Sequence, residues 1–275
     1  MTRAEVDPLW IATAAEVVLH AGAMQCERFG TDVAIDKKGV IDLVTQVDVD
    51  IERWFRAMIA ARFPGHRVLA EELGTEAEAP PAAGRTDYCW VFDPIDGTIN
   101  FTHGLPIFCA SLALEIDGVP SVAAVYDPMR EELFTAELGS GARLNGAPLR
   151  VSEADNLVDA MLCTGFPYDV HETVDDVVAL FGAFVAESRA VRRLGSAAID
   201  LCYVAAGRFD GFWEERLHPW DIAAGALLVT EAGGVVSGLG GEPFVSRHGS
   251  IVASNGRIHE KMLATIRQRS LQRTP

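Results

Sequence analysis

Long apolar runs, paired cysteines and positive charge are all scarce in this 275-residue sequence. No stretch approaches the roughly eighteen consecutive apolar residues of a membrane-spanning helix, so we expect no membrane span. The cysteines are odd in number and scattered without a CxxC pair, which gives little support to a thiolate zinc site. Most of them fall in apolar runs and are expected to be buried thiols of a reducing compartment: Cys26, Cys89, Cys109, Cys163 and Cys202.

Positive charge is outnumbered, with 23 Lys and Arg against 39 Asp and Glu and a formal net charge of -16. Such an acidic surface repels phosphate backbones and anionic membrane faces, so neither nucleic acid nor a membrane is expected as a partner. An anionic substrate would need positive charge added locally, and bound cations are the obvious source. No basic leader precedes the first apolar stretch, residues 9–19, and we therefore expect a cytoplasmic protein.

Apolar spacing predicts an α/β protein whose first half is of the α+β type. Helices are expected at residues 9–29 and from residue 47 to the Pro-Gly pair at 64–65. Strand-like runs at 107–116, 121–127, 132–138 and 143–151 contain or are separated by turn residues, which predicts an antiparallel meander. Beyond residue 155 strands and helices alternate. We therefore predict two lobes, 1–150 with most metal ligands and 151–275 with the substrate pocket, or one continuous domain.

Acidic residues stand at the ends of several predicted elements. In "WVFDPIDGTINF" (90–101) an apolar strand runs into Asp93 and Asp96, which flank Pro94-Ile95. Glu71 and Glu72 end another strand, and Asp221 opens a helix. Taken singly, each has a plain structural explanation as a turn residue, a helix cap or a solvated strand end. Asp48 fits a capping box with Thr45 in the same way.

Taken together, these acids favour a site for a hard divalent cation. Carboxylate oxygens without a nearby His or Cys cluster suit Mg²⁺ better than Zn²⁺. Pro94 fixes the backbone between the two aspartates, so both carboxylates and the Ile95 carbonyl can converge on one point. Gly97 permits an unusual backbone angle, and a helical turn opening at Thr98 would offer free N–H groups to a phosphate.

The motifs then resemble those of the inositol monophosphatase family, in its bacterial branch. The matching segments run in family order over most of the chain: "DLVTQVD" (42–48), "AEE" (70–72), "DPIDGTINF" (93–101), "LGSAAIDL" (194–201) and "WDIAAGALLVTEAGG" (220–234). The resemblance implies a layered αβαβα sandwich, two or three Mg²⁺ ions per site, lithium sensitivity, phosphomonoester hydrolysis and a homodimer. Ala70 and Ile99 depart from the family's frequent glycine and threonine, and neither change removes a ligand.

The resemblance also implies a set of metal ligands and catalytic residues. Glu71, Asp93 and the Ile95 carbonyl would bind a first ion, and Asp93, Asp96 and Asp221 a second, with a weaker third ion near Glu71. Thr98 and Asp48 would activate the attacking water, which Glu71 would help to orient.

Further residues would bind the substrate. The Gly97 and Thr98 amides would hold the phosphate, close to the ligands Asp96 and Asp221. The alcohol part would be surrounded by a second group: Gly195, Ser196, Ala197 and Glu214. Lys37 matches the basic residue of the family's mobile "KKG" loop, although Lys38 beside it leaves that assignment open.

The expected activity is hydrolysis of a small phosphate monoester by metal-activated water. Two ions could clamp the attacking and leaving oxygens, and no protein nucleophile is required. Myo-inositol monophosphate is the lead substrate because Glu214 could accept hydroxyl hydrogen bonds. Histidinol phosphate, fructose 1,6-bisphosphate and a nucleotide phosphate are rivals within the family. An alternative of another class is a non-catalytic interaction protein that keeps the fold.

Overall fold

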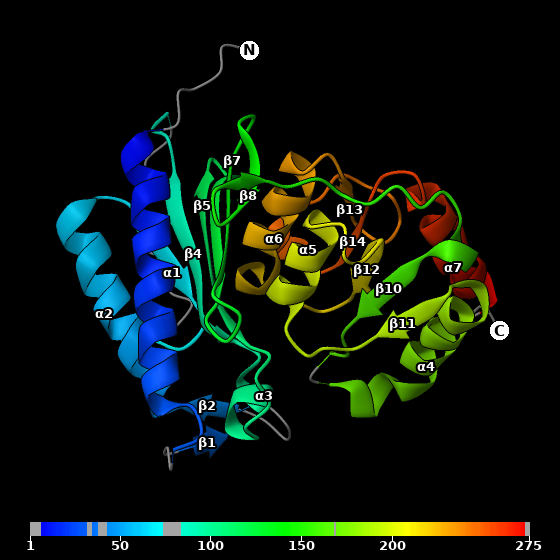
Figure 1. Cartoon of the computed structure of the whole chain (residues 1–275), viewed down its shortest axis with the longest axis horizontal. Coiled ribbons are helices and arrows are strands. Elements are labelled where there is room, and N and C mark those ends of the chain that lie inside the picture. The colour runs from blue at the N-terminus through cyan, green and yellow to red at the C-terminus, as the bar shows by residue number, and fades with distance from the viewer. Residues whose placement is uncertain (1–6, 32–34, 38–42, 74–83, 168, 273–275) are drawn as a thin grey trace.

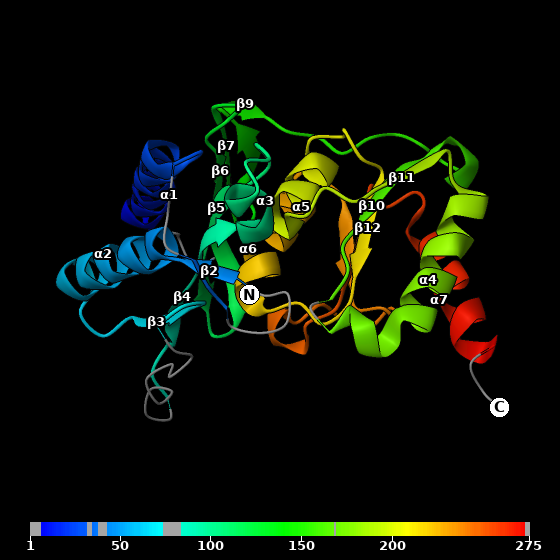
Figure 2. The ribbon, with the colours of Figure 1, turned by 90° about the horizontal axis from the view of Figure 1, so that it is seen from below.

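The computed structural model describes residues 7–31, 35–37, 43–73, 84–167 and 169–272, and arranges them in five layers (Figure 1). Helices α1 (Pro8–Arg28) and α2 (Gln46–Arg62) form the first layer, and a seven-stranded sheet forms the second. Helices α5 (Ala197–Ala205) and α6 (Pro219–Glu231) lie between this sheet and a five-stranded one (Figure 2). Helices α4 (Val170–Glu187) and α7 (His259–Gln272) cover the far side. The predicted αβαβα sandwich is confirmed.

The seven-stranded sheet is mostly an antiparallel meander, as the turn residues predicted. Only its first pair, β3 and β4, is parallel; every later neighbour pair is antiparallel. The strands lie in chain order: β3 (Arg67–Ala70), β4 (Tyr88–Asp96), β5 (Cys109–Ile116), β6 (Val119–Asp127), β7 (Glu132–Glu137), β8 (Gly141–Leu144) and β9 (Ala147–Pro148). Because β3 and β4 are parallel with Ala70 opposite Phe92, Glu71 and Asp93 emerge at the same edge.

The outer face of this sheet is covered by α1 and α2. Asp7 caps α1, Thr45 caps α2, and both helices bury one apolar face against the sheet. Among the described helices, α1 is the one that is long and apolar enough to cross a membrane by length and composition. Its buried residues, which include Val17, Val18 and Ala21, pack against the sheet, as those of a core helix do.

The five-stranded sheet is mixed. Its strands lie in the order β11 (Ala190–Arg192), β10 (Met161–Thr164), β12 (Gly211–Glu214), β14 (Ile251–Ser254) and β13 (Val235–Ser237). β11, β10 and β12 are parallel, whereas β14 is antiparallel to both of its neighbours. The carboxyl ends of β10 and β12 therefore meet at one edge, which places Gly165 beside Glu214.

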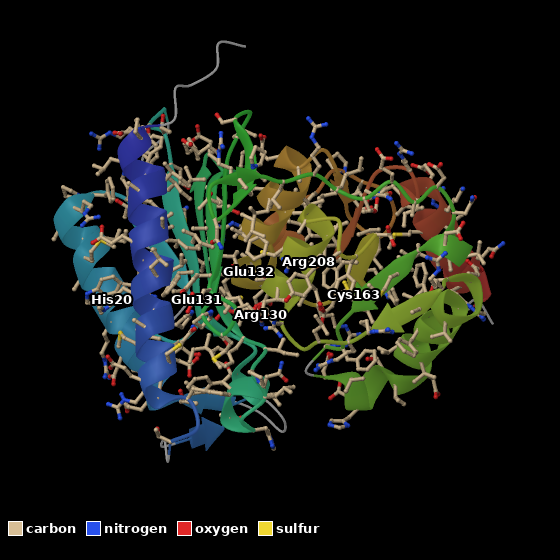
Figure 3. The ribbon with its side chains drawn as sticks, in the orientation of Figure 1. His20, Arg130, Glu131, Glu132, Cys163 and Arg208 are labelled. Carbon is tan, nitrogen blue, oxygen red and sulfur yellow. The ribbon has the colours of Figure 1, made fainter. Side chains whose placement is uncertain are left out.

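Helices α5 and α6 are buried almost all round because a sheet lies on each side of them. They pack closely on each other at Gly225, where a Cβ atom would lie 2.5 Å from Leu201. An ion pair between Arg208, which follows α5, and Glu132 of β7 also joins the two halves (Figure 3). The sheets change near residue 150, while α5 and α6 contact both, so the division into two lobes stays a prediction.

Several short elements differ from the sequence prediction. A segment expected to be a loop contains the paired strands β1 (Ile35–Lys37) and β2 (Leu43–Thr45). Strands β11 and β13 were not predicted. Four cysteines are buried as expected, and Cys26 is exposed.

Candidate active site

The first pair of predicted ligands lies at the end of β4. Asp93 and Asp96 belong to the strand itself, and the register shifts between them in a bulge. The Ile95 amide donates to Asp93 Oδ1 at 2.9 Å, and Gln25 Nε2 of α1 donates to the Pro94 carbonyl at 2.7 Å. This loop is therefore held from within by Asp93 and from outside by a buried glutamine that the sequence analysis missed.

Gly97 turns the chain from β4 into the short helix α3 (Thr98–Thr102). Its φ of 101° lies in the left-handed region, and a Cβ atom there would sit 2.9 Å from the Ile107 carbonyl oxygen. Glycine is required at this position for both reasons. The Thr98 hydroxyl donates to the Ile95 carbonyl at 2.9 Å, so two of the predicted functional groups contact each other directly.

Asp96 reaches across to the amino end of α5. Its Oδ2 accepts from the Ser196 hydroxyl at 2.7 Å and from the Ala198 amide at 2.6 Å. The positive end of the helix dipole favours a carboxylate at this place. Asn100 closes the same junction because its Nδ2 donates to the Leu194 carbonyl at 2.9 Å. A carboxyl from the first sheet is thus fixed against the segment that carries Gly195, Ser196 and Ala197.

Two further predicted site residues also begin helices. Asp221 is the third residue of α6, and its Oδ2 accepts from the His218 amide at 2.7 Å. Asp48 forms the predicted capping box, in which its Oδ2 accepts from the Thr45 amide at 2.8 Å and hydroxyl at 2.6 Å. In both cases the helix start fixes a buried or partly buried carboxyl whose charge raises the pKa of Asp93 at the end of β4.

Glu71 follows β3 in a backbone segment held by α2. Glu52 of α2 is buried, and its carboxylate accepts from the Glu72 amide at 2.6 Å and the Leu73 amide at 3.1 Å. The sequence analysis missed Glu52 because its partners lie twenty residues along the chain. Its role is to fix the direction in which the chain leaves β3.

Electrostatic coupling shows that the acids share one neighbourhood. Burial raises the pKa of Asp93 well above its usual range, and the charges of Glu71, Asp96, Asp221 and Asp48 raise it further. Burial also raises the pKa of Asp221, with Asp96 and Glu71 adding to the effect. The pKa of Asp96 rises to about 6 through burial, opposed by its hydrogen bonds to α5. These mutual effects place the acids near enough to influence one another, and their assignment as metal ligands stays a prediction.

This set of acids fits a divalent cation. Within the described ranges, no three His, Cys, Asp or Glu side chains are already grouped closely enough to hold an ion as they stand. One oxygen each of Asp93, Asp96 and Asp221 is instead bonded to a protein donor. The acids nevertheless raise one another's pKa, and this mutual repulsion is the cost that a bound cation removes. Oxygen donors of this kind are those that Mg²⁺ prefers.

A cleft opens beside these acids. Its walls include most of the predicted substrate residues: Asp96, Gly97, Thr98, Gly195, Ser196, Ala197, Glu214 and Asp221. Glu214 is buried, and burial raises its pKa to about 8, while Arg193 nearby opposes that rise. Arg193 also lines the cleft, with its guanidinium 5.7 Å from the centre of the Phe166 ring.

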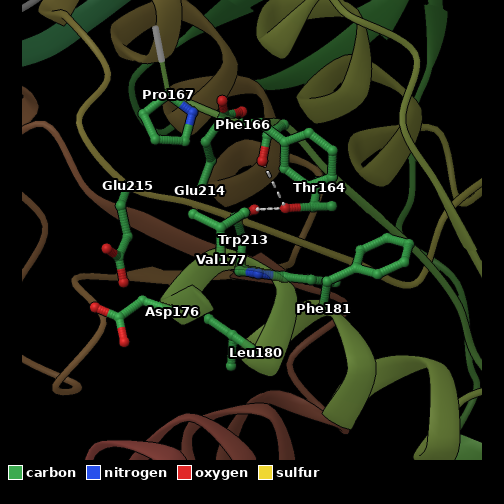
Figure 4. Close-up of a pocket in the computed structure, with 11 residues that line it drawn as sticks. Thr164, Phe166, Pro167, Asp176, Val177, Leu180, Phe181, Trp213, Glu214 and Glu215 are labelled. Atoms are coloured by element: carbon green, nitrogen blue, oxygen red, sulfur yellow. Dashed lines mark hydrogen bonds between the residues drawn. The ribbon is translucent and has the colours of Figure 1, made fainter. Parts of the chain in front are cut away.

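A second hollow adjoins the cleft at Glu214 (Figure 4). It shares Gly165, Phe166, Pro167 and Glu214 with the cleft and is otherwise lined mainly by apolar side chains of α4 and by Trp213. The Thr164 hydroxyl donates to the Trp213 carbonyl at 2.7 Å, which stabilises the side of this hollow formed by β10 and β12. Figure 4 shows the carboxyl groups of Glu214 and Glu215 pointing to opposite sides.

Lys37 and Asp200 complete the comparison with the sequence prediction. The side chain of Lys37 and residues 38–42 lie outside the described part of the structure, so its predicted role stays a prediction. Asp200 lines the cleft and was not predicted as a site residue. The available signal was an acid inside the otherwise apolar segment "SAAIDLCYVA".

A model of the inositol monophosphatase family matches residues 8–272. The chain belongs to this family. The chain is a phosphoric monoester hydrolase. Members of its family act on small phosphate substrates and generally depend on Mg²⁺. The fold and the resemblance stated from the motifs are both confirmed.

Individual relatives carry two kinds of name. The inositol-1-monophosphatase of a Synechocystis species is 43% identical over 92% of this chain and 87% of its own length. The Nus factor SuhB of Escherichia coli is 45% identical over 90% of this chain and 91% of its own length. The solved structure of inositol monophosphatase from an Anabaena species superposes with a TM-score of 0.85 at 38% identity, covering 94% of this chain and 96% of that one.

Proposed function

We propose that this inositol monophosphatase family member hydrolyses the phosphate ester of a small polyol, with myo-inositol monophosphate as the lead substrate. The observation that carries the proposal is the position of Glu214. This buried carboxyl lies in the same cleft as Asp96, Thr98 and Asp221, where it can bind hydroxyl groups of the alcohol. The rival substrates that carry more phosphate require more positive charge than the two arginines among the described residues of the cleft supply. One of those two, Arg216, is already paired with Asp169.

The residues that would hold Mg²⁺ are Glu71, Asp93, the Ile95 carbonyl, Asp96 and Asp221. Bound there, Mg²⁺ would supply positive charge for the phosphate and a water molecule of lowered pKa. Gln25 and Glu52 keep the two segments that carry these ligands in place. Their hydrogen bonds would reduce the reorganisation needed when the ligands assemble.

The remaining residues would bind the ester and move a proton. The amides of Gly97 and Thr98 would hold the phosphate. In this structure the Thr98 hydroxyl donates to the Ile95 carbonyl. To activate the attacking water it would instead donate to Asp48 and accept a hydrogen bond from the water, so that the proton from the water would reach Thr98 as Thr98 gives its own to Asp48. Ser196 keeps Asp96 directed at the same place.

Metal-dependent phosphate release tests this function. Purified protein is assayed with a panel of inositol monophosphate, histidinol phosphate, fructose 1,6-bisphosphate and a nucleoside monophosphate, with Mg²⁺, with EDTA and with added lithium. The proposal expects the highest kcat/KM for inositol monophosphate, loss with EDTA and inhibition by lithium. If another ester gives the highest kcat/KM, that ester replaces inositol monophosphate as the proposed substrate. If no ester releases phosphate in a Mg²⁺-dependent way, the proposal is refuted.

A role as a binding protein is a second candidate, favoured by relatives named Nus factor SuhB at the same level of identity. The phosphate-release assay separates the two, because a pure binding role needs no turnover. Homodimer formation and a cytoplasmic location stay predictions, and gel filtration with light scattering tests the first.

A further inference from the structure

Asp200 is a buried acid to which the predicted metal and substrate sets assign no role. It lies in α5, is 1% exposed and borders the cleft. Its Oδ1 is a buried atom for which the described part of the chain offers no hydrogen-bond partner. A buried polar atom without a hydrogen-bond partner lowers the stability of the fold. We therefore expect a bound molecule to supply the missing hydrogen bond.

The position of Asp200 on its helix directs it toward the substrate side. Ser196 and Asp200 are four residues apart and therefore share one face of α5. Ser196 Oγ bonds to Asp96 at the cleft, so this face of the helix is the one that the cleft exposes. The unpartnered oxygen of Asp200 thus lies one helical turn deeper than the bond that fixes Asp96.

The charged and titratable neighbours of Asp200 are Glu214, Asp96, Arg193 and the Cys163 thiol. Burial raises its pKa, and the charges of Glu214 and Asp96 raise it further, while Arg193 opposes them. These effects hold Asp200 toward its neutral acid form, which can donate as well as accept a hydrogen bond. A hydroxyl group, which also does both, is the natural partner for such a pair of carboxyl groups.

We propose that Asp200 and Glu214 form a hydroxyl-binding subsite at the floor of the cleft, which selects phosphate esters whose alcohol carries at least one further hydroxyl group. The proposal rests on the phosphatase function above and names the part of the substrate that this floor recognises. An ester without such a hydroxyl would leave the Asp200 oxygen unpaired. Selection therefore comes from a group that the wrong substrate cannot satisfy.

The test compares two substrates in three proteins. Inositol 1-phosphate and propyl phosphate, which has no further hydroxyl, are assayed with wild type, Asp200→Ala and Asp200→Asn. In Asp200→Ala we expect the ratio of the two kcat/KM values to fall about tenfold, the effect of one hydrogen bond, mainly through KM for the inositol ester. Asparagine keeps a donor and an acceptor at the same place, so Asp200→Asn should retain most of the ratio.

The outcomes separate this subsite from the phosphatase function. Wild type that releases phosphate from neither ester contradicts the proposed function itself. If wild type prefers the inositol ester and Asp200→Ala keeps the same ratio of kcat/KM values, the subsite alone is refuted. Asp200 Oδ1 would then be the partner of a buried water. A purely structural role would lower both kcat/KM values equally and leave the ratio unmoved. Should Asp200→Ala not fold, Asp200→Val, which suits the apolar surroundings of α5, takes its place under the same criteria.

Discussion

Gly165→Ala should displace Glu214 and weaken substrate binding while the protein still folds. Gly165 follows β10, and Glu214 ends the parallel neighbour β12. A Cβ atom at position 165 would lie 2.1 Å from Oε2 and 2.2 Å from Oε1 of Glu214. Non-bonded contacts in proteins lie above about 3 Å, so the carboxyl group must retreat by about 1 Å.

The expected size of the effect follows from that displacement. A misplacement of about 1 Å at a binding group costs up to about a hundredfold in rate, and we expect a ten- to hundredfold loss of kcat/KM for inositol monophosphate. The steric cost of about 1–3 kcal/mol is partly offset by about 0.4–1 kcal/mol from the lower entropy of the unfolded chain. The free energy of unfolding should therefore fall by no more than about 2.6 kcal/mol.

Gly182→Ala is the matched control. Apart from its chain neighbours and the backbone of its own helix, no heavy atom lies within 4 Å of a Cβ atom at this exposed position in α4. It should raise the free energy of unfolding by about 1 kcal/mol and leave the kinetics unchanged. Steady-state phosphate release and denaturant melts measure both variants. A folded Gly165→Ala with wild-type KM and kcat would refute the placement of Glu214 in substrate binding.

Three further predictions concern the acids and their supports. Asp96→Asn should lower kcat by at least about a hundredfold, yet fold, since the amide oxygen can still accept the bonds from α5; near-normal turnover contradicts the metal assignment. Because burial raises the pKa of Glu214 from 4.5 to about 8, the native state binds the extra proton between these values. The free energy of unfolding of metal-free protein should thus fall as pH rises through this window, by at most about 5 kcal/mol from this group. In melts at pH 5 and 8.5, Glu214→Gln should reduce this pH dependence without abolishing it, because Asp93, Asp96 and Asp221 also have raised pKa values. Gln25→Leu removes the bond to Pro94 and should raise several-fold the Mg²⁺ concentration for half-maximal activity; an unchanged requirement would mean that this bond does not position the loop.

The sequence predicted those elements that carry a repeated local signal. Helix α2 has apolar residues at helical spacing, and the strands β5 to β8 are separated by turn residues, so both were found. Strands β11 and β13 have three residues each, too few for an alternating pattern, and are strands because β10 and β14 pair with them. Their existence depends on partners elsewhere in the chain.

The same distinction applies to the site. Asp93, Asp96 and Gly97 stand together in one motif and were predicted from it. Gln25 acts on a carbonyl 69 residues away, and nothing local marks a helical glutamine as the support of a distant loop. Asp200 was overlooked because its significance comes from an unpaired oxygen, which is a property of the folded surroundings.

Asp48 and Asp221 each begin a helix, and Asp96 anchors the start of another. Replacing these residues with side chains that cannot accept the same hydrogen bonds therefore also lowers stability, even in a descendant that no longer turns over substrate. Divergence among such descendants should instead accumulate first at positions like Glu214, which begins no helix. The acidic motifs therefore reflect the fold as well as catalysis. The residues at the floor of the cleft reflect the substrate that the protein still binds.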